Sequence, residues 1–143
     1  HIIMRYEIEQ QMIREEVEVE TLPALWNSRM EGYLGIKPPD DARGVLQDTH
    51  WSQGLIGYFP TYLLGNLYAA QFMEQMREDL KDLDTLVEKG EFLPIREWLR
   101  KEVHARGRLF SASELVEEVT GRPLTPEPFI NYLENKFGEL YRL

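Results

Sequence analysis

The sequence predicts an all-α protein, and three observations support this class. Apolar residues recur every three or four positions through most of the 143 residues, the spacing of a helix face that packs on a core. The alternating pattern of a strand occurs only in the acidic stretch from Glu15 to Thr21, which could form a short extended piece. Helix start and stop signals also flank several of the periodic segments.

The first part of the chain contains two predicted helices and a long irregular segment. A first helix covers residues 2 to about 15, and a second has Pro23 near its first turn and ends at Gly35. Residues 38–41, Pro-Pro-Asp-Asp, are typical of a turn. Residues 44–60 are rich in glycine, aromatic and polar residues without a clear period, so we expect an ordered loop or very short helices there.

Helices also account for the rest of the chain. In order, we expect a long helix from Tyr62 to about Leu80, one or two further turns that Gly90 ends, an amphipathic helix over 94–104, a short helix that the Ser111 capping box opens and a last helix from Thr125-Pro126-Glu127. The pattern predicts one helical segment over residues 1–143.

Composition and charge exclude several classes of function. The 16 Lys and Arg against 25 Asp and Glu give a net charge of −9, which argues against nucleic acid as a partner. The chain has no cysteine, so it has no disulfide, thiol nucleophile or thiolate metal site. It also has no apolar run of the ~20 residues that a membrane span needs. We therefore expect a cytoplasmic protein without a membrane partner.

A single arginine stands out in the first predicted helix. At ~100° per residue, His1, Arg5 and Glu9 fall in one narrow sector of a helix that is otherwise apolar nearly all round. Such a helix is normally buried, and a buried arginine must be paired or must face a polar cavity where an anion can meet it. The two interpretations are a functional anion site and a purely structural Arg5–Glu9 ion pair.

The irregular segment is the second candidate for function. Between Gly44 and Asn66, glycines at 44, 54, 57 and 65 allow tight turns or close backbone approach. Histidine, tryptophan, tyrosine, aspartate and glutamine lie among them, and these are residue types that line polar pockets. Aromatic residues that plug a well-packed loop are the alternative, and a pocket around His50 would favour function.

These motifs resemble the M32 family of metallocarboxypeptidases. The resemblance rests on HIIMRYEIE at residues 1–9, GVLQDTHWS at 44–52, GYFPTYLLGN at 57–66 and, near the end, the segments from His104 and Glu114. It covers essentially the whole chain in order and corresponds to the C-terminal part of the family. It implies a multi-helix portion of a larger fold with a deep groove, usually in a homodimer, and removal of C-terminal residues from peptides with zinc or cobalt.

The resemblance also implies roles for particular residues. Arg5 would bind the terminal carboxylate, and Tyr58 or Tyr62 would help by hydrogen bonding, with Tyr68 left as a third possibility. His50 would stabilise the oxyanion or orient the substrate. The residues expected to shape and hold that loop are Gln47, Asp48 and Trp51.

One departure from the family limits these expectations. The His-Glu-x-x-His motif and the further glutamate that hold the family's metal are absent from this chain. We therefore expect no bound metal and no peptide cleavage by this chain alone, with the missing N-terminal part of the enzyme as a partner. The helical pattern already runs at His1, which favours a piece of a longer chain over an engineered start or a leader, and apolar surface exposed by such a cut predicts self-association. A non-catalytic peptide-binding module and a purely structural piece remain alternatives.

Overall fold

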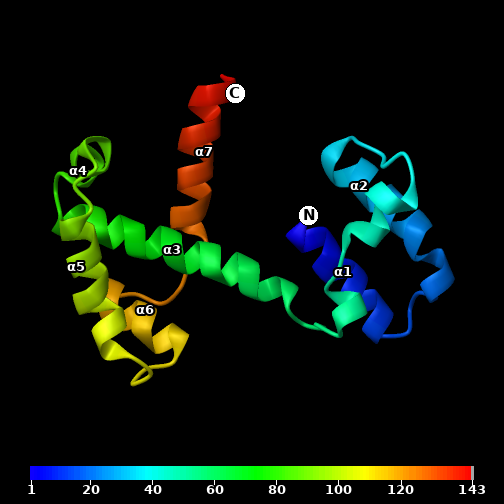
Figure 1. The fold of residues 1–143 in the computed structure, drawn as a ribbon, viewed down its shortest axis with the longest axis horizontal. Coiled ribbons are helices and arrows are strands. Elements are labelled where there is room, and N and C mark those ends of the chain that lie inside the picture. Colours follow the sequence, from blue (N-terminus) through cyan, green and yellow to red (C-terminus); the bar gives the residue numbers. More distant parts are fainter. Residues whose placement is uncertain (143) are drawn as a thin grey trace. The chain divides into compact units, whose positions relative to one another are not determined.

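The computed structural model describes residues 1–142, which form seven α-helices joined by turns and short 3-10 helices, with no strand among them (Figure 1). The all-α prediction is confirmed. The α-helices are α1 (Ile2–Ile13), α2 (Leu22–Leu34), α3 (Phe59–Asp79), α4 (Leu83–Lys89), α5 (Leu93–Glu102), α6 (Ala112–Thr120) and α7 (Glu127–Tyr141). The 3-10 helices are Val19–Thr21, Asp41–Arg43, Val45–Gln47, Trp51–Gln53 and His104–Arg106.

The chain divides into two compact units, one from His1 to Leu64 and one from Gly65 onward, and each is described by itself. The boundary lies inside α3, within what the sequence predicts as one helical segment. α3 begins at Phe59, three residues before the predicted Tyr62, because Pro60 is compatible with the first turn of a helix. The acidic stretch from Glu15 forms a turn and a 3-10 helix instead of an extended piece.

The first unit is built on contacts between α1 and α2. Met4 and Ile8, one helical turn apart on α1, pack with Leu22 and Trp26 of α2, and all four are buried. Trp51, from the irregular segment, packs against the same core. Other apolar residues of α1, among them Ile3 and Ile13, are exposed, so the helix is buried on one side only.

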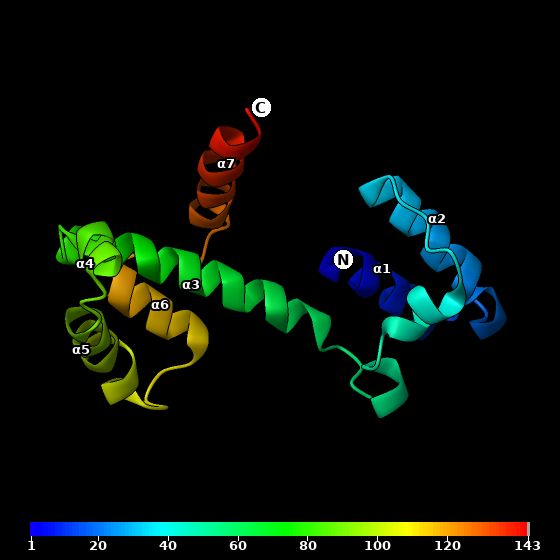
Figure 2. The ribbon, with the colours of Figure 1, turned by 45° about the horizontal axis from the view of Figure 1, so that its top comes forward.

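In the second unit, α4, α5 and α6 gather around the C-terminal part of α3 (Figures 1 and 2). Met76, Leu83 and Trp98 form the buried core. The indole nitrogen of Trp98 donates a hydrogen bond of 2.7 Å to Asp79 at the end of α3, so this large ring is buried with its polar atom satisfied.

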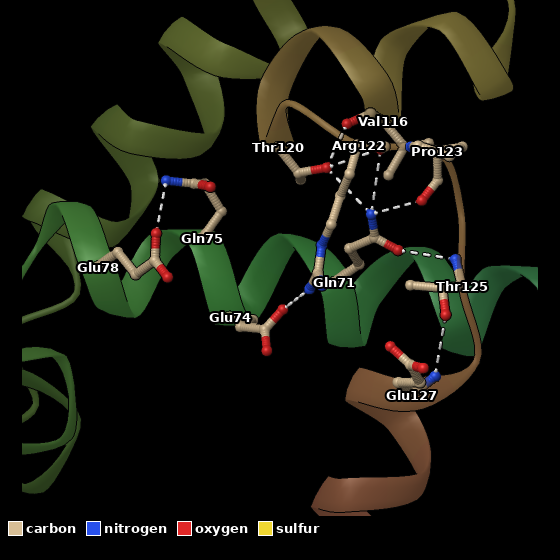
Figure 3. Close-up of polar contacts among 10 residues, drawn as sticks. All are labelled: Gln71, Glu74, Gln75, Glu78, Val116, Thr120, Arg122, Pro123, Thr125 and Glu127. Carbon is tan, nitrogen blue, oxygen red and sulfur yellow. Dashed lines mark hydrogen bonds and ion pairs between the residues drawn. The ribbon is translucent and has the colours of Figure 1, made fainter.

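A fully buried glutamine fixes the linker between α6 and α7 (Figure 3). Nε2 of Gln71 donates to the hydroxyl oxygen of Thr120 at 3.0 Å and to the carbonyl oxygens of Arg122 and Pro123 at 3.3 and 3.1 Å. Its Oε1 accepts a hydrogen bond of 3.0 Å from the backbone N–H of Thr125. One side chain of α3 therefore determines where the chain runs before α7.

A groove of about 730 Å³ lies between α3 and α7 in this unit. Ala69, Ala70 and Met73 line it from α3, and Phe129 and Tyr132 are among the residues that line it from α7. Of the helices that the structure describes, none has the length and apolar character needed to cross a membrane.

Candidate functional site

Arg5, on α1, pairs with Asp48 of the irregular segment. Arg5 Nε lies 2.7 Å from Asp48 Oδ2, and the side chains of the two residues are 15% and 0% exposed. The contact is a close charge pair whose atoms are not aligned as a hydrogen bond. The guanidinium also lies over the ring of Trp26, 4.9 Å from its centroid, a favourable cation–π arrangement. The structural alternative of an Arg5–Glu9 ion pair is therefore wrong.

Asp48 holds the loop as well as the arginine. Its Oδ1 accepts hydrogen bonds from the backbone N–H groups of His50 and Trp51, at 2.9 and 3.3 Å. Its Oδ2, the oxygen that faces Arg5, lies 3.6 Å from Nδ1 of His50. Arg5 and His50, which come from the two candidate segments of the sequence, thus meet at one carboxylate.

His50 and two tyrosines form an aromatic corner that is open to solvent. Nε2 of His50 lies 3.0 Å from the hydroxyl of Tyr62, within hydrogen-bonding distance. The ring of Tyr58 stacks on His50 at 6.0 Å between centroids and meets Tyr62 edge-on at 5.2 Å. Both tyrosines are 43% exposed, so part of each side chain is open to solvent. Phe59, fully buried, lies 4.8 Å from the imidazole centroid and supports the corner from inside.

A second buried carboxylate, Glu9, connects α1 to the same segment. Its Oε2 accepts a hydrogen bond of 3.1 Å from the indole nitrogen of Trp51, and its Oε1 accepts one of 2.8 Å from the backbone N–H of Gly57. From the sequence, Glu9 falls in one helix sector with Arg5 and is expected only as the partner in a structural ion pair. The signal that could have identified it is its position, one turn after Arg5 on an apolar helix.

The structure brings most of the predicted site residues together, whereas Trp51 contacts the core and Gln47 contacts its own loop. Arg5, Asp48, His50, Tyr58 and Tyr62 form one connected cluster. The ring of Trp51 packs edge-on against Trp26 and Phe59, so it is an anchor in the core. The side-chain amide of Gln47 donates to the carbonyl of Ala42 within its own loop. Tyr68 belongs to the second unit, where it stacks on Phe72.

The described residues do not fit a metal ion. Among residues 1–142, no three side chains of His, Cys, Asp or Glu gather closely enough to hold one. Asp48 lies beside His50, but its Oδ2 already faces Arg5. A cationic neighbour disfavours a bound cation.

Comparison with known proteins assigns the family. The profile described as Carboxypeptidase Taq (M32) metallopeptidase matches residues 1–137. This chain belongs to the M32 family. Carboxypeptidase 1 of Bacillus subtilis is 49% identical over 143 residues, all of this chain and 28% of that relative. Thermostable carboxypeptidase 1 of Thermus thermophilus is 45% identical over 141 residues, which are 99% of this chain and 28% of that protein.

The fold agrees with solved M32 structures. The M32 carboxypeptidase from Deinococcus radiodurans R1 matches all of this chain with a TM-score of 0.93 and 37% identity, over 29% of its own length. The expected origin of the chain, as part of a larger helical metallopeptidase fold, is thus supported by sequence and by structure. Because this M32 chain spans only 28% of the length of the curated relatives above, the activity of a whole enzyme is a separate question.

Proposed function

We propose that this chain is the C-terminal segment of an M32 carboxypeptidase, and that it binds the free carboxylate of a peptide substrate. The observation that supports this role is the pairing of Arg5 with Asp48 beside His50 and two exposed tyrosines. The enzyme would release C-terminal amino acids from peptides, and the chain alone would be inactive.

The chemistry of Arg5 suits a terminal carboxylate. A guanidinium has five N–H donors in a planar fork that matches a carboxylate with two parallel hydrogen bonds. Asp48 lies at the Nε edge, which leaves the fork of Nη1 and Nη2 as the end that a ligand can approach, and Nη1 contacts the ring of His1 in this structure. Asp48 therefore orients the fork and offsets the cost of burying it.

His50 and Tyr62 provide the proton chemistry next to that fork. The carboxylate of Asp48 favours the tautomer of His50 that carries its proton on Nδ1, so Nε2 accepts from the hydroxyl of Tyr62. When the imidazole is doubly protonated, Nε2–H donates to the tyrosine oxygen and frees the tyrosine O–H for the substrate. The pair can thus orient a peptide carbonyl or stabilise negative charge on its oxygen.

The metal site of the enzyme would lie outside this chain. Zinc or cobalt, with its ligands and a general base, would come from the N-terminal part, because the described residues offer no ligand set. We also propose a homo-oligomer in the cytoplasm. The alternative is a non-catalytic peptide-binding or structural module.

The test compares peptides that differ only at the C-terminus, a free acid against an amide, in the complete enzyme that contains this segment. We expect Arg5→Lys and Arg5→Ala to lower kcat/KM for the acid by about 10- to 100-fold, because the hydrogen bonds between the guanidinium and the substrate carboxylate are lost. Both variants should also reduce the preference for acid over amide. Arg29→Ala is the matched control, because Arg29 lies 3.7 Å from Glu7 and outside the cluster.

Two results would contradict the proposal. An unchanged preference for the acid in both Arg5 variants would remove the assigned role of Arg5. Turnover by the purified chain of 143 residues, with contaminating peptidase and metal excluded, would show that no further part is needed.

A further inference from the structure

Glu9 is buried without a charged partner in its hydrogen bonds. The residue is 3% exposed, and both donors that the structure gives its carboxylate, the indole of Trp51 and the N–H of Gly57, are neutral. Burying a carboxylate is costly unless its lone pairs are satisfied, and a neutral residue would fill the space at a smaller cost. The positions of these two donors along the chain indicate the role of the carboxylate.

The two donors flank the aromatic corner along the chain. Trp51 directly follows His50, and Gly57 directly precedes Tyr58. Gly57 has a φ of +78°, in the left-handed region that favours glycine, so the backbone turns sharply where Glu9 holds it. Glu9 therefore clamps the segment on both sides of the turn that presents His50 and Tyr58.

Glu9 and Arg5 together form two links between α1 and the irregular segment. They are four residues apart on α1, so they lie on the same face one turn apart. Arg5 pairs with Asp48 at the beginning of the segment, and Glu9 holds Trp51 and Gly57 farther along it. The second link fixes where the exposed rings of Tyr58 and Tyr62 stand relative to the guanidinium.

We infer that Glu9 is a positioning residue for the substrate carboxylate. It sets the distance between the fork of Arg5 and the aromatic corner by binding the indole of Trp51 and the backbone of Gly57 at once. This inference rests on the proposed function, because it assigns Glu9 a part in the same site. A carboxylate is required because both of its oxygens must accept, whereas an amide has one acceptor and would direct N–H groups at a donor.

The test uses Glu9→Gln in the complete enzyme, with Glu7→Gln as the matched control. Glu7 lies on the same helix but contacts Tyr33 and Arg29. We expect Glu9→Gln to raise KM for the free-acid peptide about tenfold, with a smaller change in kcat and a reduced preference for acid over amide. Glu9→Asp keeps the charge but is one methylene shorter, and should change the same parameters in the same direction.

The outcomes separate this inference from the proposed function. If Arg5→Lys loses its preference for the acid while folded Glu9→Gln and Glu9→Asp enzymes bind like the wild type, only the role of Glu9 is overturned. If neither Arg5 nor Glu9 variants change that preference, the proposed function fails and the inference fails with it. Glu9 variants that only lower the unfolding midpoint, with KM unchanged, also overturn it, because a purely structural role predicts that result.

Discussion

In the unit that ends at Leu64, irregular backbone is held by two buried carboxylates, whereas in the unit that begins at Gly65 it is held by the neutral amide of Gln71. The amide makes four hydrogen bonds and leaves no charge away from water. Each carboxylate must be desolvated, a much larger cost. An amide is thus sufficient to fix a linker, so the carboxylates indicate a further task.

The difference between the two units follows from what the held backbone presents. The linker fixed by Gln71 leads into α7 and carries no exposed cluster of histidine and tyrosine. The segment fixed by Asp48 and Glu9 ends in the half-exposed rings of Tyr58 and Tyr62, which contact His50. We infer that Asp48 places the charge of Arg5, whereas Glu9 places the backbone on both sides of the aromatic corner. Substitutions in each unit test this difference.

The largest effect is expected for Asp48→Ala, which leaves Arg5 unpaired and two backbone N–H groups without their acceptor. We expect a loss of about 3–5 kcal/mol in the stability of the first unit, the range for breaking a buried ion pair. Hydrogen–deuterium exchange of peptides from residues 1–64 measures that unit by itself. Asp48→Asn is the control, since it keeps an acceptor for the loop and should lose less. Equal losses in the two variants would show that the charge contributes nothing.

A smaller effect is expected for Gln71→Leu, which removes all four hydrogen bonds of a fully buried side chain but strands no charge. The unsatisfied groups should cost about 2–4 kcal/mol, measured by exchange in peptides of the second unit. Gln71→Glu is the control: its carboxylate faces the carbonyl oxygens of Arg122 and Pro123, so it should destabilise more at pH 7 than at pH 4, where a protonated carboxyl can donate. A loss as large as that of Asp48→Ala would show that the buried charge of Asp48 matters no more than the neutral amide of Gln71.

The helix ends could be predicted from the sequence because their causes are local. Gly35, Gly90 and Gly121 end α2, α4 and α6 in the left-handed conformation, as their positions behind apolar stripes indicate. Ser111 forms the expected capping box at the start of α6. Each signal involves residues only a few positions apart, so one stretch of sequence contains both partners.

The contacts of the site could be predicted only in part, because they join distant residues. Spacing offered Glu9 as a partner for Arg5, whereas the true partner is Asp48, far along the chain. The segment that carries His50 has no period because its shape comes from hydrogen bonds such as the one from Gly57 to Glu9, 48 residues apart. The motifs therefore singled out residues that lie together in the fold, and only the fold shows which atoms they use.

The smallest effect concerns a third carboxylate that binds backbone, Glu114 in the first turn of α6, which is exposed. Hydrogen bonds from Ser111 lower the pKa of Glu114, chiefly the side-chain contact and then the backbone one. Because the pKa is lower in the folded chain, this contribution to stability is present above the unfolded pKa and is lost as the pH falls through the folded one. Exchange in peptides that cover α6 should rise modestly over that acidic window, and Glu114→Gln, which cannot titrate, should remove this part of the pH dependence. The Asp48→Ala loss should far exceed this change, since an exposed carboxylate gives up little solvation when it binds backbone, and that contrast isolates burial as the cause of the difference between the two units.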